Sequence, residues 1–150
     1  MVSTSAGEIA ALSWSEAGSE APLLHFAHAT GFNAHTYRRL LEPLSKRFRI
    51  AASDARGHGR TRLLAIPENL VSWQTYEADL ERLLEVLGEP AFLIGHSIGA
   101  TVSLMLAARR PDLALGVAMI EPSFVPFNRA CQVALDRREG NFIPFDIALQ

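Results

Sequence analysis

The chain has 150 residues, of which 49% are hydrophobic, and a formal net charge of −2 at pH 7. A chain of this size can bury roughly 68–70% of its unfolded surface, and the apolar content excludes disorder, so one globular domain is expected. The basic clusters at 46–49 and 56–62 are too small for a nucleic-acid footprint, so no nucleic-acid partner is expected. Because Cys131 is the only cysteine, an internal disulfide and a cysteine-based metal site are excluded, and we expect neither a metal nor a cofactor.

The first third of the chain predicts two strands and a helix. The strands are expected at 9–14 and 23–28, and the second leads into the loop His28-Ala29-Thr30-Gly31. We expect the His28 side chain to hold this loop by hydrogen bonds, a structural role. A helix is expected after Asn33, a residue that caps helices well. Its predicted apolar face consists of Tyr37, Leu40, Leu41 and Leu44.

The middle of the chain predicts a strand, a tight turn and a second helix. The strand is expected at 48–53 and the turn at 54–61, where Gly57 and Gly59 favour positive φ. We expect Asp54 and Arg56 to pair and brace this turn, which is a structural role. The helix is expected at 72–87 with one apolar face on the sheet. Its acidic residues are expected to point away from that face: Glu77, Asp79, Glu81 and Glu85.

The strongest pattern is Gly95-His96-Ser97-Ile98-Gly99, between a strand expected at 91–95 and a helix that starts at Ile98. In this setting G-x-S-x-G predicts a strained turn that presents the Ser97 hydroxyl. Gly95 and Gly99 are needed because a Cβ at either position would clash with a neighbouring element.

The residues around this pattern also bear on whether the chain spans a membrane. Residues 91–108 carry no charge over 18 positions, which is the length of a membrane span. Because the glycines and His96 interrupt this stretch, we expect no span. The N-terminus, at 1–7, lacks the pattern of a signal peptide, so a cytoplasmic protein is expected.

A last strand is expected at 115–120, followed by Glu121. Beyond residue 122 the alternation of strands and helices stops. We therefore predict that residues 1–122 belong to the core and that 123–150 begin a cap or lid insertion over the site. A sheet that stops at this strand has a bare apolar edge, and we expect self-association through it.

Three landmarks resemble the α/β-hydrolase superfamily in its serine esterase-like branch: the 28–31 loop, the 54–61 turn and the 95–99 elbow. The resemblance runs from about residue 7 to 124. It implies an α/β fold with a mostly parallel sheet flanked by helices, here truncated before the family's last strands. It also implies that Ser97 works with a histidine and an acid. Ala29 departs from the glycine that is usual in the first landmark.

Serine at the elbow predicts acyl transfer. Family members that open epoxides or displace halide are similar in fold but use aspartate there, because an alkyl-enzyme ester forms on a carboxylate. The bond cleaved could be that of an ester, a thioester, an amide or certain C–C bonds. Of these we expect hydrolysis of a small-molecule ester or thioester through an acyl-enzyme on Ser97. The backbone N–H groups of Thr30 and Ile98 are the expected donors to the oxyanion.

The proton-accepting part of the pattern is missing. The resemblance implies the order serine, acid, histidine, but no histidine follows His96. Glu121 is a candidate acid, although a plain carboxylate at the end of a strand is the simpler interpretation. Three interpretations stay open: a hydrolase represented by an incomplete chain, a non-catalytic small-molecule binding module, and a subunit whose histidine comes from another polypeptide.

Overall fold

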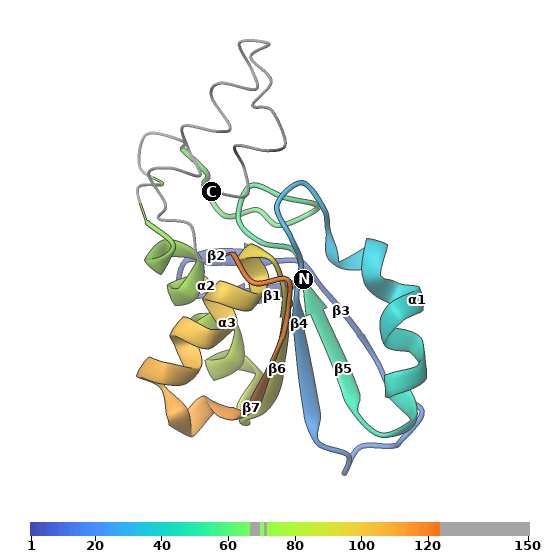
Figure 1. Cartoon of the computed structure of the whole chain (residues 1–150). Coiled ribbons are helices and arrows are strands. Elements are labelled where there is room, and N and C mark those ends of the chain that lie inside the picture. The colour runs from blue at the N-terminus through green and yellow to red at the C-terminus, as the bar shows by residue number, and fades with distance from the viewer. Residues whose placement is uncertain (67–69, 71, 124–150) are drawn as a thin grey trace, which may run out of the picture.

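The computed structural model describes residues 1–66, 70 and 72–123 (Figure 1). One sheet contains β3 (Ala11–Trp14), β4 (Leu23–Ala27), β5 (Arg49–Ser53), β6 (Ala91–His96) and β7 (Ala114–Ile120). The strand order is β3-β5-β4-β6-β7, in which β3 is antiparallel to β5 and the other neighbours are parallel. The predicted α/β class and mostly parallel sheet are confirmed. The predicted insertion lies outside the described residues, apart from its first position, Ser123.

The N-terminal strand is shorter than predicted. Instead of one strand over 9–14, a hairpin of β1 (Val2–Thr4) and β2 (Gly7–Ile9) precedes β3. Ala10 separates the two sheets, because its N–H donates to Thr61 Oγ1 at 2.9 Å and its carbonyl accepts the Asp54 N–H at 2.8 Å. These bonds to the turn after β5 interrupt the strand ladder at this residue.

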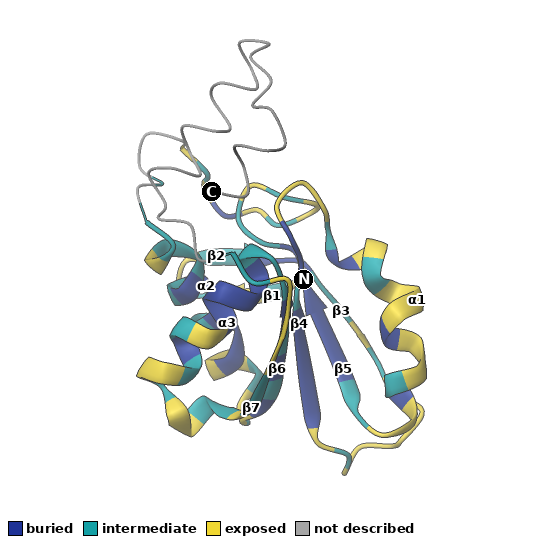
Figure 2. Cartoon of the chain, viewed as in Figure 1, coloured by how far each residue is buried: buried dark blue, intermediate teal, exposed yellow. Residues whose placement is uncertain are grey.

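Helices cover both faces of the sheet, as Figure 1 shows. α2 (Gln74–Leu87) and α3 (Ile98–Arg109) lie on one face and α1 (Arg38–Leu41) on the other. Alternate residues of β4 serve the two sides, since Leu23 packs in the cluster with α2 and α3 and Phe26 in the cluster with α1. Figure 2 shows the buried residues concentrated on the central strands and on the inner sides of these helices.

The predicted helix after Asn33 is divided into three short pieces. Asn33 caps the first piece, its side chain accepting a backbone N–H of the first turn at 3.2 Å. α1 is a single turn between 3-10 turns at Ala34–Tyr37 and Glu42–Lys46, and the second of these contains Pro43, which has no N–H to donate. The change of pitch places Leu40 at the surface, 56% exposed, so its predicted position on the apolar face is wrong.

Two acidic residues of α2 are also placed differently. Glu77 and Asp79 are only 5% and 6% exposed and do not point away from the core. Arg109 Nε donates to Glu77 at 2.6 Å, and Arg56 donates two hydrogen bonds to Asp79, at 2.8 and 2.7 Å. Hydrogen-bonded pairing allows a carboxylate to be buried, whereas an isolated one would be too costly. The predicted pair of Asp54 and Arg56 is therefore wrong, since Arg56 reaches α2 instead.

The uncharged stretch 91–108 is shared between β6 and α3. β6 lies between β4 and β7 within the sheet, and α3 packs against it. Within the described ranges, no helix is both long and apolar enough to cross a membrane.

Candidate active site

Ser97 occupies the sharp turn between β6 and α3. Its backbone angles, φ 54° and ψ −118°, are strained for a residue other than glycine. The Ser97 N–H donates to the Ile120 carbonyl at the end of β7 at 2.9 Å, and its own carbonyl accepts the Ala100 N–H at 3.1 Å. The turn thus has the geometry that the G-x-S-x-G pattern predicts, while the nucleophilic role of the hydroxyl stays a prediction.

Two glycines allow the chain to fold this tightly. A Cβ at Gly95 would lie 2.2 Å from the Gly99 carbonyl carbon, and a Cβ at Gly99 would lie 2.2 Å from the Ala27 carbonyl oxygen. Real Cβ atoms do not approach so closely, so the predicted need for glycine is confirmed. The second contact also shows that the start of α3 packs directly on the end of β4. The loop after β4 therefore lies beside the elbow.

This loop, at 28–31, makes a tight turn. Gly31 has a φ of 81°, and the Phe32 N–H donates to the Ala29 carbonyl at 3.1 Å. Thr30 is exposed within the turn. Neither its N–H nor that of Ile98 donates a hydrogen bond to any other residue in the described part of the chain. Their assignment as oxyanion donors remains a prediction that these unused N–H groups support.

His28 ties the loop to the turn after β5. Its Nε2 accepts the Ala55 N–H at 2.9 Å, so the ring proton lies on Nδ1, which donates to the Ala29 carbonyl at 2.8 Å. Burial lowers the pKa of His28 and so favours this neutral ring. A histidine held at both nitrogens braces the loop, as expected for a structural residue.

The turn after β5 supports the same region. Asp54 Oδ1 accepts the Ala34 N–H and Oδ2 accepts the Arg60 N–H, each at 2.8 Å. Gly57 and Gly59 have the predicted positive φ, 74° and 52°. A Cβ at Gly59 would lie 2.0 Å from the Asp54 carboxylate. Backbone N–H groups, rather than the predicted arginine, are the partners of Asp54.

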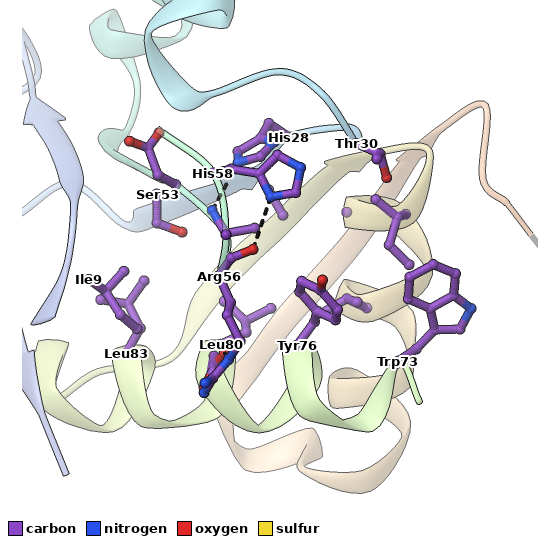
Figure 3. Close-up of a pocket in the computed structure, with 18 of the residues that line it drawn as sticks. Ile9, His28, Thr30, Ser53, Arg56, His58, Trp73, Tyr76, Leu80 and Leu83 are labelled. Atoms are coloured by element: carbon purple, nitrogen blue, oxygen red, sulfur yellow. Dashed lines mark hydrogen bonds and ion pairs between the residues drawn. The ribbon is translucent and has the colours of Figure 1, made fainter. Parts of the chain in front are cut away.

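His58 is a second brace, which the sequence interpretation missed. Its Nδ1–H donates to the Arg56 carbonyl at 2.9 Å, a bond drawn in Figure 3, and its Nε2 accepts the Gly31 N–H at 3.1 Å. The His28 and His58 rings meet edge to face with centroids 5.1 Å apart. Together the two histidines hold the loop on both sides of Thr30. The one signal in the sequence is the position of His58 between two glycines of the turn.

The residue before Ser97 belongs to a third hydrogen-bonded group. The Tyr37 hydroxyl accepts the Ala29 N–H at 3.4 Å and shares a hydrogen bond with His96 Nδ1 at 2.7 Å. His96 Nε2 lies 3.6 Å from Glu121 Oε2. The Glu121 side chain is 86% exposed, and the contact that this candidate acid makes is with His96. Tyr37, predicted as a core residue, thus also links the 28–31 loop to the elbow.

A general base is not found among the described residues. None of them forms a hydrogen bond with the Ser97 hydroxyl. Hydrogen bonds to the partners described above engage His28, His58 and His96. His25 Nε2 lies 2.8 Å from Ser53 Oγ in the core. Over the same described ranges, no group of His, Cys, Asp and Glu side chains is arranged to hold a metal ion.

A cavity of about 460 Å³ lies beside the elbow (Figure 3). α2 forms one side of it, and the loops after β4 and β5 form the other. Thr30, Ile98 and Gly99 are among its lining residues. The predicted oxyanion donors therefore border a space that is large enough for a small molecule.

The chain is similar in sequence and fold to known proteins. The family described as alpha/beta hydrolase fold matches residues 22–142. The chain is 38% identical over 107 residues to a 2-(acetamidomethylene)succinate hydrolase of Mesorhizobium japonicum, with 71% of this chain and 37% of that protein covered. It is 30% identical over 142 residues to an esterase of Mycobacterium tuberculosis, with 89% of this chain and 43% of the esterase covered.

Among solved structures, a hydrolase from Pseudomonas aeruginosa is similar with a TM-score of 0.77 at 25% identity, over 91% of this chain and 52% of that one. The chain spans less than half the length of the two curated relatives. The family match extends over more than half of the chain and includes β4 to β7 of the sheet, the 28–31 loop and the elbow. The chain therefore belongs to the alpha/beta hydrolase fold family.

Proposed function

We propose that the protein is a serine hydrolase that cleaves an ester or thioester through an acyl-enzyme on Ser97. The observation that carries the proposal is the strained backbone of Ser97 at the start of α3. Serine, rather than aspartate, at this position supports acyl transfer. The names of the two curated relatives, a hydrolase and an esterase, support the same class of reaction.

The proposed reaction has two steps. Ser97 Oγ attacks the carbonyl carbon while its proton passes to a base, and the alcohol or thiol leaves with that proton. Water then attacks the acyl-enzyme by the same route and releases the acid. The N–H groups of Thr30 and Ile98 receive the oxyanion in both steps, and one such donor contributes roughly 2.7–4 kcal/mol in known hydrolases. The positive end of the α3 dipole adds to this stabilisation.

The base in this proposal is a histidine outside residues 1–150, on a longer form of the chain or on another polypeptide. The proposal rests on two observations. No histidine follows His96 in the sequence, and no described histidine contacts the Ser97 hydroxyl. Glu121 stays a candidate for the acid, because the neighbouring Ile120 carbonyl accepts the Ser97 N–H.

Labelling with a fluorophosphonate tests the nucleophile. For this test the chain is to be fused to the C-terminal segment of the Mesorhizobium relative, because the family order places the acid and the histidine after the serine. We expect the fusion to be labelled and to hydrolyse p-nitrophenyl esters, and Ser97→Ala to lose both. Ser103→Ala, which removes a buried hydroxyl from the same helix, is the matched control and is expected to keep both. Labelling or near-parent turnover in Ser97→Ala would end the proposal.

Binding without turnover is the second candidate function. One observation favours it: the cavity is lined by described residues, whereas no described residue forms a hydrogen bond with the Ser97 hydroxyl. A folded fusion that binds a small ester but shows no turnover dependent on Ser97 would replace the first proposal by this one.

A further inference from the structure

The cavity beside the elbow is elongated along α2. Figure 3 shows Thr30 and Trp73 at one end of it and Ile9 and Leu83 at the other. Its volume, about 460 Å³, lies within the usual range of small-molecule sites, roughly 300–1,000 Å³. An ester whose carbonyl oxygen is held at Thr30 therefore has the length of this cavity available for its acyl group.

One face of α2 supplies most of the apolar wall. Its apolar lining residues, with Trp73 at the N-cap, follow one another at spacings of three and four, which places them on one stripe: Trp73, Tyr76, Leu80 and Leu83. Val102 continues this wall from α3, one turn beyond Ile98. A wall of this kind binds by removing apolar surface from water, so the ligand group that matches it is apolar.

The charged groups that line the cavity already have partners. Arg56 donates two hydrogen bonds to Asp79, at 2.8 and 2.7 Å, and it is the only arginine or lysine among the described lining residues. The Asp54 carboxylate accepts two backbone N–H groups. His25 is neutral at physiological pH, because burial lowers its pKa to about 4. A ligand carboxylate would find no unpaired cation among these residues and would meet two carboxylates.

We propose that this cavity binds the acyl group of the substrate and selects an uncharged, apolar acyl chain over one that carries a carboxylate. The inference rests on the proposed hydrolysis at Ser97 and adds the substrate class to it. Val102 is the specificity-determining residue that the geometry singles out, since it lines the cavity one turn from Ile98.

Binding can be measured without turnover in the Ser97→Ala chain. The sequence has two tryptophans, of which Trp73 lines the cavity while Trp14 packs on the α1 side of the sheet. Adding Trp14→Phe therefore leaves Trp73 as the single fluorescent reporter. From butanamide to octanamide we expect saturable binding that becomes roughly fourfold tighter with each methylene. The monoamide of suberic acid, which has the same number of carbons and a carboxylate at its far end, is expected to bind roughly tenfold or more weakly.

Matched substitutions of two valines test whether the ligand binds beside Val102. Val102→Phe fills the cavity and is expected to weaken octanamide binding roughly tenfold or more. Val86→Phe changes a residue of α2 that is 51% exposed and is expected to leave octanamide binding unchanged. Should Val102→Phe fail to fold, Ala65→Phe narrows the same cavity from the loop after β5 and is expected to give the same loss. Equal affinities for octanamide and the suberic acid monoamide, or unchanged binding in both cavity variants, would overturn the proposal.

A second measurement separates this proposal from the proposed function. In the fused chain, Val102→Phe is expected to lower the kcat/KM ratio of p-nitrophenyl octanoate to acetate roughly tenfold or more, with Val86→Phe as control. Octanamide binding without any turnover that depends on Ser97 would contradict the hydrolase proposal. Turnover whose octanoate-to-acetate ratio is unchanged in both Val102→Phe and Ala65→Phe would overturn the acyl cavity.

Discussion

The interior of the sheet and its β7 edge are built in different ways. The loops that follow β4 and β5 are joined by hydrogen bonds that the His28 ring, the His58 ring and the Asp54 carboxylate make. Figure 2 shows exposed residues on β7, and its large apolar side chains are accessible to solvent: Leu115, Met119 and Ile120, at 49%, 44% and 38%. The candidate oxyanion groups thus lie in a braced interior, while Glu121 lies at an open edge.

This difference shows which half of the proposed chemistry these residues support. Stabilising an oxyanion requires backbone N–H groups held in place before the reaction, and His28, His58 and close-packed glycines hold the backbone around the candidate donors. Moving the Ser97 proton requires a side chain within hydrogen-bond reach of the hydroxyl, and the described residues include none. The interior can therefore be tested in the chain itself, and the proton transfer only after a base is supplied.

The largest effect is expected from one methyl group placed in the interior. Gly99→Ala puts a Cβ 2.2 Å from the Ala27 carbonyl oxygen, a backbone atom that cannot move aside, so we expect the free energy of unfolding to fall by more than about 4 kcal/mol. Gly116→Ala, the same change on β7, meets side-chain atoms of Phe92 at 3.2 and 3.3 Å and is expected to cost about 1 kcal/mol. Urea unfolding measures both values. If the free energy of unfolding fell by similar amounts in the two variants, the interior of the sheet and its β7 edge would not differ in how tightly they are packed.

Removing one oxyanion donor is expected to have the next largest effect. Thr30→Pro eliminates a backbone N–H, so in the fused chain we expect kcat to fall roughly 10²–10³-fold, or about 2.7–4 kcal/mol, with a smaller change in KM. Thr30→Ala keeps the N–H and is expected to lose far less. Steady-state hydrolysis of p-nitrophenyl esters provides the measurement. A kcat for Thr30→Pro equal to that of the parent would place the donor elsewhere in the loop.

Buried His25 makes the stability of the interior depend on pH. Burial and the nearby His28 lower its pKa in the folded state from 6.5 to about 4, so the unfolded chain takes up the proton first. The stabilisation is complete above pH 6.5 and decreases as the pH falls from 6.5 toward 4. Between pH 7 and pH 5 we expect His25 to account for a loss of about 2 kcal/mol.

Urea unfolding of the parent and of His25→Gln at these two pH values measures the loss. The pKa of His28 is shifted in the same direction, so the pH dependence in His25→Gln is expected to be reduced rather than abolished. His35→Gln, which changes an exposed histidine, is the control. An equal pH dependence in the parent and His25→Gln would show that another group titrates.

Much of the interior could be predicted from residue patterns. The positions of β4, β5 and β6 follow to within one residue from their apolar runs, because strands covered on both faces carry few polar residues. The elbow follows from glycines and serine at fixed spacing. The helix after Asn33 was predicted as one piece because its apolar spacing is helical, but Pro43 changes its pitch.

The bracing contacts could not be predicted, since they join residues that are far apart in the chain. Arg56 and Asp79 are separated by 23 positions, and Tyr37 and His96 by 59. Proximity in the sequence favours Asp54 as the partner of Arg56, yet the Asp54 carboxylate is occupied by backbone N–H groups. Such choices depend on how strands and helices pack, which a local pattern does not contain.

The smallest effect on stability is expected at the β7 edge, where the effect on association should be the clearest. β7 is the last strand in the sheet order, so among the described residues no strand pairs with its outer side. Exposed apolar edges of this kind pair with other chains unless a charge or a bulge prevents it. We therefore expect the chain to self-associate through β7.

Met119→Lys places a charge on this edge and is expected to shift the chain toward the monomer, while the free energy of unfolding changes by about 0.5 kcal/mol or less. Leu64→Lys changes a 73% exposed apolar residue in the loop after β5 and is the matched control, expected to associate like the parent. Sedimentation velocity at several protein concentrations gives the mass of each chain. If the parent is monomeric at every concentration, or if both lysine variants associate alike, then exposed apolar residues alone do not make β7 a pairing edge. The apolar residues of β7 would then differ from those of the interior only in their exposure to solvent.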